Sequence, residues 1–221
     1  MKKSIIALVA ACSAVSAQAA TVSFQYGLPI VESTTEITQT GFLGLFDSSL
    51  GTLTGATLDV FGSATFAYTG RNTAAQTQTA NLTSSTAIVW SSGLGALTPF
   101  LGDVINLSST TGFLSYASGE TKSFGPVAGS GTFSDDLATI LVSLQAPGGG
   151  SFGVTCESFS GFNVQGGGGN IDTTQDTKAG CGARIVYTYD APPPPQLPEP
   201  ASLALVGLAL AGIGAAQRRK L

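Results

Sequence analysis

Hydrophobic and polar residues alternate with a period of two through much of this chain. Between Ala56 and Thr69 the even positions are Ala, Leu, Val, Gly, Ala, Phe and Tyr in turn, while the odd positions are mostly Thr, Asp and Ser. Residues 79–90 and 184–189 alternate in the same way. A period of two is typical of a β-strand with one buried face. The pattern therefore predicts strands in all three segments.

One segment breaks the alternation. Residues 137–144 are apolar on both faces except for Thr139 and Ser143, which predicts a central strand covered on both sides. Together with the alternating segments, it defines a predicted buried core. The core residues expected from these patterns are Leu58, Val60, Phe66, Ile140, Val142 and Tyr187, and the phase of Trp90 also places it in the core.

Glycine clusters divide the apolar segments from one another. We expect turns at residues 93–95, 129–131, 148–150 and 166–169, where glycine is most frequent. No stretch between Thr21 and Asp190 has a helical period with caps. Short strands, frequent glycine and abundant Ser and Thr favour an all-β fold, an antiparallel β-sandwich, over a helical or α/β fold.

The net charge and the missing histidine exclude several classes of protein. The 221 residues contain no histidine, so Ser-His-Asp and Cys-His catalysis and His-ligated zinc are excluded. Between Ala20 and Gln196 only four basic residues face twelve acidic ones, a net charge of −8. A sparse acidic surface does not attract phosphate backbones, so nucleic acid is not an expected partner.

Two cysteines, Cys156 and Cys181, lie beyond the first nineteen residues, which are predicted below to be removed on export. An even number of cysteines in an exported chain indicates a disulfide. A catalytic thiol is the alternative, and without histidine nothing in the sequence lowers its pKa.

The first nineteen residues have the layout of a secretory signal peptide. Lys2 and Lys3 form a basic start, residues 5–15 are mostly apolar, and Ala17 and Ala19 are the small residues that signal peptidase requires. We predict cleavage after Ala19. An uncleaved anchor is disfavoured because the apolar run is too short to span a bilayer. Lipoprotein processing at Cys12 would leave only eight residues after Lys3, which is short for export.

The C-terminus has the layout of a membrane anchor. Residues 191–197 form a proline-rich linker, and the apolar run 201–216 precedes Arg218, Arg219 and Lys220. Sixteen helical residues reach about 24 Å, short of the roughly 30 Å of a bilayer core, which local thinning can accommodate. The basic tail fits the cytoplasmic side. A buried core helix is the alternative, but the run contains no charge and one hydroxyl, Ser202.

The last twenty-five residues resemble the PEP-CTERM sorting signal of Gram-negative bacteria that produce exopolysaccharide. The resemblance rests on Pro198, Glu199 and Pro200, the following short apolar helix, and the basic tail. It implies that an exosortase, a membrane-embedded cysteine protease or transpeptidase, recognises the tripeptide and processes the protein near it. A sortase substrate would need Leu-Pro-x-Thr-Gly, whereas Ala201 follows Pro200 here.

The middle of the chain resembles the choice-of-anchor E domain, a bacterial surface module found with differing C-terminal anchors. Residues 40–53 and the closing segment 183–189 carry this resemblance, which spans nearly all of residues 21–189. It implies a surface location and supplies no catalytic residue. The glycine-rich segments 148–150 and 166–169 are additions not expected of the family.

Candidate chemistry in the middle segment is sparse. Residues 166–172 resemble a calcium-binding glycine-rich repeat, but Asn170 occupies a glycine position and there is no second copy. Two acidic pairs, Asp135 with Asp136 and Asp172 with Asp176, offer oxygen ligands for calcium, but a solvated turn is the favoured explanation of each pair. A glycosidase needs two carboxylates about 5–10 Å apart, and no local pattern selects such a pair. We therefore predict no catalytic residue, no metal site and no cofactor.

These observations predict four segments: a signal peptide (1–19), a β-sandwich domain (20–190), a linker (191–197) and a sorting signal (198–221). The expected function is that of a non-enzymatic envelope or matrix protein, connected with exopolysaccharide or biofilm. Signal peptidase and exosortase are the expected processing partners, and the C-terminal helix would hold the precursor in the inner membrane. A calcium- or carbohydrate-binding adhesin and a carboxylate-pair surface hydrolase are the alternatives; a flat sheet with exposed aromatic residues would favour the adhesin.

Overall fold

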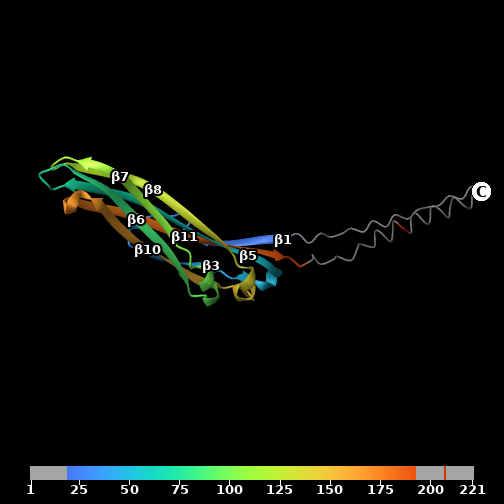
Figure 1. The fold of residues 1–221 in the computed structure, drawn as a ribbon. Coiled ribbons are helices and arrows are strands. Elements are labelled where there is room, and N and C mark those ends of the chain that lie inside the picture. Colours follow the sequence, from blue (N-terminus) through green and yellow to red (C-terminus); the bar gives the residue numbers. More distant parts are fainter. Residues whose placement is uncertain (1–18, 193–206, 208–221) are drawn as a thin grey trace, which may run out of the picture. The chain divides into compact units, whose positions relative to one another are not determined.

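The computed structural model describes residues 19–192 and Gly207, and the described part is all-β (Figure 1). Residues Ala19–Asp190 form one compact unit. Two antiparallel sheets make up most of it, as a β-sandwich, so the predicted fold class of this domain is confirmed. The second unit, residues 1–18 and 191–221, lies almost entirely outside the described residues.

The first sheet, here sheet A, has the strand order β1-β11-β5-β8, and β2 pairs with β11. Its strands are β1 (Ala19–Tyr26), β2 (Ser33–Thr34), β5 (Thr52–Asn72), β8 (Thr121–Asp136) and β11 (Ile171–Asp190). The second sheet, sheet B, has the order β3-β10-β6-β7. Its strands are β3 (Thr38–Gly44), β6 (Gln78–Ser92), β7 (Ile105–Tyr116) and β10 (Ser151–Gly166).

Short elements complete the unit at the strand ends. The parallel pair β4 (Phe46–Asp47) and β9 (Gln145–Ala146) forms a separate two-stranded sheet. Four short 3₁₀ helices lie in the connections: η1 (Ser48–Leu50), η2 (Gly95–Phe100), η3 (Ala138–Leu144) and η4 (Gly167–Gly169).

The alternation seen in the sequence corresponds to the two faces of each sheet. In β5 every even residue from Ala56 to Asn72 is buried, and in β6 the even residues from Ala80 to Trp90 are buried. Leu58, Val60, Phe66 and Tyr187 are at most 5% exposed, as predicted, and Trp90 is 6% exposed. Strand periodicity therefore identifies the buried face of the central strands.

Glycine in β8 lets the two sheets approach closely. Residues 129–131 lie inside β8, so the turn predicted there is wrong. Gly131 pairs with Gly62 of β5. A Cβ added at Gly131 would lie 2.7 Å from Ile105 Cγ2, and one at Gly62 would lie 2.8 Å from Ile88 Cδ1. The glycine pair is needed because isoleucines of sheet B occupy the space where side chains would be.

The predicted central strand at residues 137–144 is also wrong, because this segment forms η3. Asp136 Oδ1 accepts a hydrogen bond from Ala138 N at 2.9 Å, which turns the chain where β8 ends. Leu137 and Leu144 are fully buried, but Val142 is 84% exposed and Ile140 is half-buried. Ile140 and Val142 therefore do not belong to the core as predicted.

A disulfide joins the two sheets. Cys156 of β10 and Cys181 of β11 are bonded, with their Cα atoms 6.6 Å apart. In sheet B, Cys156 pairs with Trp90 of β6, so the indole and the disulfide lie beside each other. Both cysteines are buried, which makes this covalent link part of the core.

Buried hydroxyl groups cross between the sheets farther along the same strands. Thr177 of β11 and Ser84 of β6 have their side-chain oxygens 3.2 Å apart, and Gln175 Nε2 donates to both. Ile37 N donates to Ser158 Oγ at 3.1 Å. Ser84, Ser158 and Thr177 occupy inward positions that the alternation alone assigns to apolar residues, and their hydrogen bonds make burial tolerable.

Several sequence predictions lie outside the described residues. They are the signal peptide except Ala19, most of the linker, the apolar segment 201–216 except Gly207, and the basic tail. Of the signal peptidase site, only Ala19 is described, at the start of β1. Among the residues that are described, no helix is long and apolar enough to cross a membrane.

Candidate functional site

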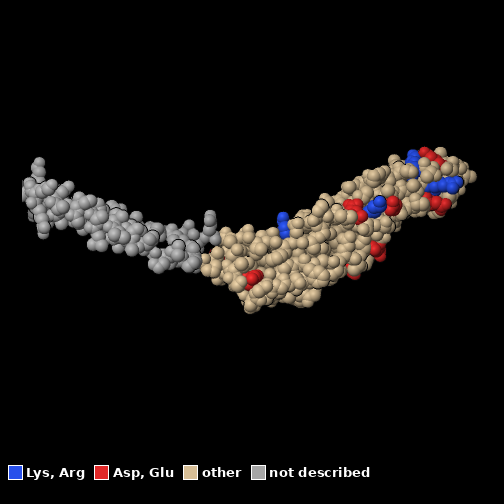
Figure 2. All heavy atoms as spheres, turned by 180° about the vertical axis from the view of Figure 1, so that it is seen from behind, with Lys and Arg blue, Asp and Glu red and all other residues tan. Residues whose placement is uncertain are grey.

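Charge is distributed unequally between the two sheets. The four strands of sheet B, all within the described residues, contain one charged residue, Glu157. Sheet A contains ten, spread over β5, β8 and β11. In the view of Figure 2, charged side chains are few, gather mostly toward one end of the domain and leave wide uncharged areas. Sheet B therefore offers almost no charge, so a partner that binds it cannot depend on ion pairs.

Hydroxyl and amide groups cover the outer face of sheet B. The odd residues of β6 from Thr79 to Ser91 point outward, opposite the buried even residues. Thr40 and Thr155 have their hydroxyl oxygens 2.8 Å apart across β3 and β10. Across β6 and β7, Thr83 Oγ1 donates to Thr110 Oγ1, which donates to Asn81 Oδ1 at 2.8 Å. The face is thus a regular array of neutral groups that both donate and accept hydrogen bonds.

Three phenylalanines stand on the same outer face. Phe42, Phe113 and Phe159 are 67%, 60% and 51% exposed. Phe42 pairs with Gly153, an outward position of β10 that shares its face with Phe159, and Phe113 pairs with outward-facing Asn81. Through strand pairing, the three rings correspond to positions 153, 159 and 165 of β10. Successive positions are six residues apart, or about 20 Å at 3.4 Å per residue. The exposed rings therefore form a diagonal series across the face.

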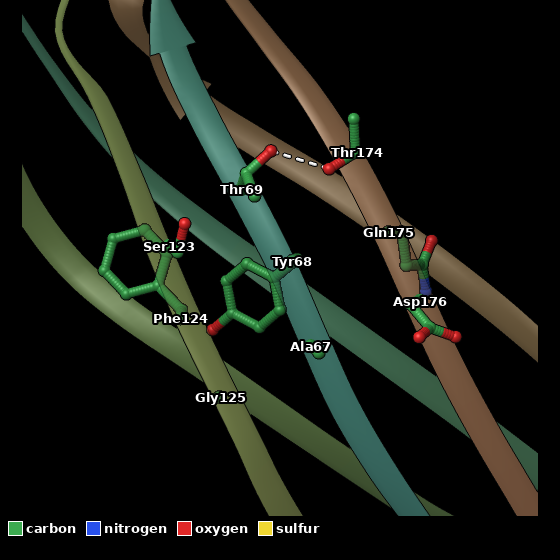
Figure 3. A pocket seen from close by; sticks show the side chains of 9 residues that line it. All are labelled: Ala67, Tyr68, Thr69, Ser123, Phe124, Gly125, Thr174, Gln175 and Asp176. Carbon is green, nitrogen blue, oxygen red and sulfur yellow. Dashed lines mark hydrogen bonds between the residues drawn. The ribbon is translucent and has the colours of Figure 1, made fainter.

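A shallow hollow of about 320 Å³ lies on sheet A, where β8 is irregular beside β5 (Figure 3). Thr69 of β5 and Thr174 of β11 have their hydroxyl oxygens 2.6 Å apart across it. The rings of Tyr68 and Phe124 stack with centroids 5.4 Å apart at the other side. Asp176 supplies the one carboxylate among the lining residues. Hydroxyls, a carboxylate and ring edges can hold a small polar molecule, but the hollow has no second charged group for catalysis.

A second hollow, of about 230 Å³, opens beside the disulfide. Tyr26, Gln39 and Cys181 line it. Gln39 Oε1 accepts a hydrogen bond from Cys181 N at 3.2 Å. Burial raises the pKa of Tyr26 to about 12, and its hydroxyl has no hydrogen-bond partner among the described residues. The phenol therefore stays neutral in the physiological range and is unsuited to act as a base there.

The acidic pairs singled out in the sequence do not converge. Asp172 and Asp176 both lie in β11, four residues apart in a strand rather than in a solvated turn, and Asp135 and Asp136 end β8. Burial raises the pKa of the Asp135 carboxyl, and the negative charge of Asp103 raises it further. Neither Asp135 nor Asp103 lines either of the two hollows. Within the described residues no three His, Cys, Asp or Glu side chains gather in a way that could hold a metal ion.

The glycine-rich segment at residues 166–169 forms the turn expected of it. Gly166 ends β10 and η4 follows, with every glycine from Gly166 to Gly169 at positive φ. Asn170 Nδ2 donates back to Gly168 O at 3.2 Å. The side chain that departs from the calcium-binding repeat thus closes the turn together with Asn170 N, which donates to Gly167 O at 2.9 Å.

Sequence reasoning missed the uncharged face of sheet B. The signal was present, because β3, β6 and β7 contain no charged residue and their outward positions are rich in Ser, Thr and Asn. Periodicity tells which residues share a face of one strand, but it does not tell which strands lie side by side. The predicted sorting residues lie outside the described residues; they are Pro198, Glu199, Pro200, Arg218, Arg219 and Lys220.

The fold and these features define an all-β sandwich module with a disulfide between its sheets, a bond typical of exported proteins. Residues 196–220 match the family described as the PEP-CTERM protein-sorting motif. That motif indicates an exported bacterial protein, made as a membrane-anchored precursor and sorted by an exosortase. The match covers the tail alone, and the resemblance of residues 21–189 to choice-of-anchor E stays an expectation.

The comparison with curated proteins finds no match. Among solved structures, infectious bursal disease virus of the Gx strain is similar at 11% identity, covering 88% of this chain and 47% of that chain with a TM-score of 0.18. The Gt strain gives 14% identity, 94% and 52% coverage and a TM-score of 0.20. The chain spans about half the length of these solved chains. At such TM-scores the likeness carries no argument about fold or function.

Proposed function

We propose that this protein is a non-enzymatic component of the cell envelope or extracellular matrix that binds neutral exopolysaccharide through the outer face of sheet B. The observation that carries the proposal is the composition of that face: hydroxyl pairs, three exposed phenylalanines and a single carboxylate. Exposed aromatic residues on the outer face of a sheet are the feature that favours a carbohydrate-binding adhesin over a passive structural role.

The chemistry of the face matches that of an uncharged glycan. A sugar ring offers hydroxyls around its edge, which pair with groups such as those of Thr40, Thr83 and Asn81 that both donate and accept. Its C–H faces carry partial positive charge and pack against the negative face of a phenyl ring. An anionic polymer would gain no counter-charge here and would meet Glu157. The face is therefore suited to a neutral polymer.

The route to the cell surface follows from the two ends of the chain. We propose that signal peptidase cleaves after Ala19 and that the C-terminal helix then holds the precursor in the inner membrane. Exosortase reads Pro198-Glu199-Pro200 and removes the helix, which delivers the domain to the surface or matrix of a Gram-negative cell. The choice-of-anchor E resemblance supports the same location for residues 20–190.

A binding experiment with matched variants tests the proposal. Mature protein is run in gels containing dextran, a neutral glucan, or alginate, a polyanion, and its retardation is measured. We expect retardation by a neutral polymer and its loss in the triple variant Phe42→Ser, Phe113→Ser, Phe159→Ser. Val142→Ser, which removes an even more exposed apolar side chain outside sheet B, is the control and should bind like wild type. Unchanged binding of the triple variant would contradict the proposal.

Calcium-dependent adhesion and glycan hydrolysis remain as alternatives that the same assay separates. Retardation that disappears with a chelator would indicate a calcium-dependent adhesin built on the carboxylates of β8 or β11. Shortening of the polymer during incubation, abolished by Asp135→Asn, would indicate a hydrolase. We expect neither result, because Asp135 and Asp103 line neither of the two hollows and lie outside the strands that carry the three phenylalanines.

A further inference from the structure

The exposed phenylalanines of this protein are confined to one face. The chain has twelve phenylalanines, all within the described residues, and most of them are buried or half-buried. The exposed ones, Phe42, Phe113 and Phe159, all stand on the outer face of sheet B. Exposed apolar residues are normally scattered singly over a surface. Their restriction to one face therefore indicates a surface that binds something.

The three rings are also spaced evenly. Measured along β10, Phe42 and Phe159 are six positions and one strand apart, and Phe159 and Phe113 are six positions and two strands apart. With about 3.4 Å per residue and about 4.8 Å between strands, the Cα atoms of each neighbouring pair are about 20 Å apart, and those of the two end residues about 40 Å apart. Phe159 is therefore the middle ring, at a similar distance from either end.

Hydroxyl groups lie between the first two rings. Thr40 and Thr155, which pair two positions along from Phe42, have their side-chain oxygens 2.8 Å apart. The next row contains Glu157, the single charged residue of sheet B. The interval from Phe42 to Phe159 therefore offers neutral hydrogen-bonding groups and one negative charge.

The interval from Phe159 to Phe113 contains hydroxyl groups as well. Ser85 lies in the row two positions along from Phe159, and Thr83 and Thr110 pair in the row after it. Thr83 Oγ1 donates to Thr110 Oγ1 at 3.1 Å. No charged residue lies in these two rows of sheet B, all of which is described. Both intervals thus have the same layout, with a ring at each end and hydroxyl groups between.

Small neighbours leave the rings open to a ligand. A Cβ added at Gly153 would lie 3.9 Å from Phe42 Cε1, so this ring extends over a residue that has no side chain. Phe159 pairs with Ala87, whose side chain is a single methyl group. A ligand lying on the face can therefore contact these rings directly, in keeping with their exposed fractions.

We propose that Phe159 is shared by two overlapping binding registers, one from Phe42 to Phe159 and one from Phe159 to Phe113. Each register takes an extended, β-linked neutral glycan that is long enough to contact two rings at once. The second contact of such a chain is intramolecular, which strengthens binding, whereas a short fragment that reaches one ring gains nothing. This inference rests on the proposed function and adds the form of the glycan, its minimum length and the residue on which both registers depend.

Oligosaccharides of graded length test the bridging of two rings. Cellobiose is shorter than one interval, whereas cellohexaose, an extended β-linked chain, is longer than one interval and shorter than two. Calorimetry with mature protein should show that cellohexaose binds at least tenfold more tightly than cellobiose. Maltohexaose, which has as many sugars but coils, should bind more weakly than cellohexaose. Equal affinities for cellobiose and cellohexaose would overturn the proposal.

Single substitutions test the sharing of Phe159. Phe159→Ser removes both registers and should weaken cellohexaose binding at least tenfold. Phe42→Ser and Phe113→Ser each leave one register, so the association constants of these two variants should add up to that of wild type. Phe159→Tyr keeps the ring and should restore binding, and Val142→Ser is the control outside sheet B. Thermal unfolding checks that each variant is folded.

The outcomes distinguish the two registers from the proposed function. If Phe159→Ser binds cellohexaose no more weakly than either end variant, the shared register is wrong. The proposed function still stands in that case if a neutral polymer is bound and the phenylalanine triple variant loses it. If wild-type protein binds a neutral polymer in the gel but no cellohexaose, the registers are likewise wrong. If it binds neither, both proposals fail.

Discussion

The side-chain amide of Asn72 forms hydrogen bonds with several backbone groups. It is fully buried at the end of β5, where Nδ2 donates to Tyr116 O at 2.9 Å and to Gln76 O at 2.8 Å. Its Oδ1 accepts from Ala74 N at 2.9 Å. One amide therefore organises the β5–β6 turn and connects it to the end of β7.

Replacing this amide should destabilise the domain. Asn72→Ala leaves several buried backbone groups without partners, and each costs about 1–3 kcal/mol when unsatisfied. We expect a fall of at least about 2 kcal/mol in the free energy of unfolding, measured by urea denaturation. Asn106→Ala, on the exposed side of β7, is the control and should change stability little. A similar effect of both substitutions would contradict the role given to Asn72.

The Asp135 carboxyl should make the stability of the fold depend on pH. Burial and the nearby charge of Asp103 raise its pKa in the folded protein, so ionisation of this carboxyl destabilises the fold. At about pH 3 the group is protonated in both folded and unfolded states and contributes nothing; the penalty develops as pH rises through the folded-state pKa.

Asp135→Asn should therefore raise the melting temperature at about pH 7 and leave it nearly unchanged at about pH 3. Thermal unfolding followed by circular dichroism at both pH values measures this. Asp172→Asn, an exposed carboxylate of β11, should not reproduce the pH-dependent gain. A gain of equal size at both pH values would mean that packing or local hydrogen bonding, and not charge, is responsible.

At the scale of elements, η3 shows how an apolar run can be misassigned. Residues 137–144 contain enough apolar side chains for a strand buried on both faces, but only Leu137 and Leu144 are fully buried. Ala138 N donates to Asp136 Oδ1, which turns the chain just before η3, and Leu137 N donates to Ala56 O at 2.8 Å. This local hydrogen bond between side chain and backbone at the end of β8, which a hydropathy pattern does not register, favours a turn over a continued strand.

Truncating a buried and an exposed side chain of η3 should therefore lower the free energy of unfolding by different amounts. Leu144→Ala removes a fully buried side chain and should lower the free energy of unfolding by about 2–5 kcal/mol. Val142→Ala should change it by less than about 0.5 kcal/mol, because the side chain is 84% exposed. Chemical denaturation of both variants checks this. Comparable losses would restore the predicted two-sided strand.

At the scale of the whole domain, the disulfide links strands that belong to different sheets. Cys156 and Cys181 are 25 residues apart in sequence, and closing a loop of this length stabilises by about 3.5 kcal/mol in the chain-entropy model. The double variant Cys156→Ser, Cys181→Ser should therefore unfold at lower denaturant concentration by about that free energy. Native wild-type protein should resist alkylation without a reductant, and labelling of both cysteines would disprove the bond.

The sorting tail extends the prediction to the fate of the whole chain. Pro198 and Pro200 restrict φ and separate the tripeptide from the apolar segment, and Glu199 places one charge beside it. We expect Glu199→Ala to leave export and folding intact but to slow removal of the C-terminal segment, as seen by intact mass in a strain with an active exosortase. Deleting residues 218–220 should instead yield unprocessed secreted protein. Wild-type processing of the Glu199 variant would refute this role.

The sequence by itself determines the strands of the alternating segments, the two faces of those strands and the address at the C-terminus. Alternation in residues 56–69 and 79–90 predicts buried and exposed positions correctly because side chains of a strand point to opposite sides whatever lies beside it. The sorting motif is equally local, since a processing enzyme reads a short contiguous segment, and residues 196–220 match it directly.

Only the tertiary structure decides which faces meet and which remain open. Gly131 lies within a strand because β8 pairs with β5, and it must be glycine because Ile105 occupies the space above it. Ile140 stays half-buried because the chain turns at Asp136. Phe42, Phe113 and Phe159 are far apart in sequence, and they share one face only because the order β3-β10-β6-β7 places their strands in one sheet. The physical reason is that strand pairing and sheet packing depend on long-range contacts, which local periodicity does not specify.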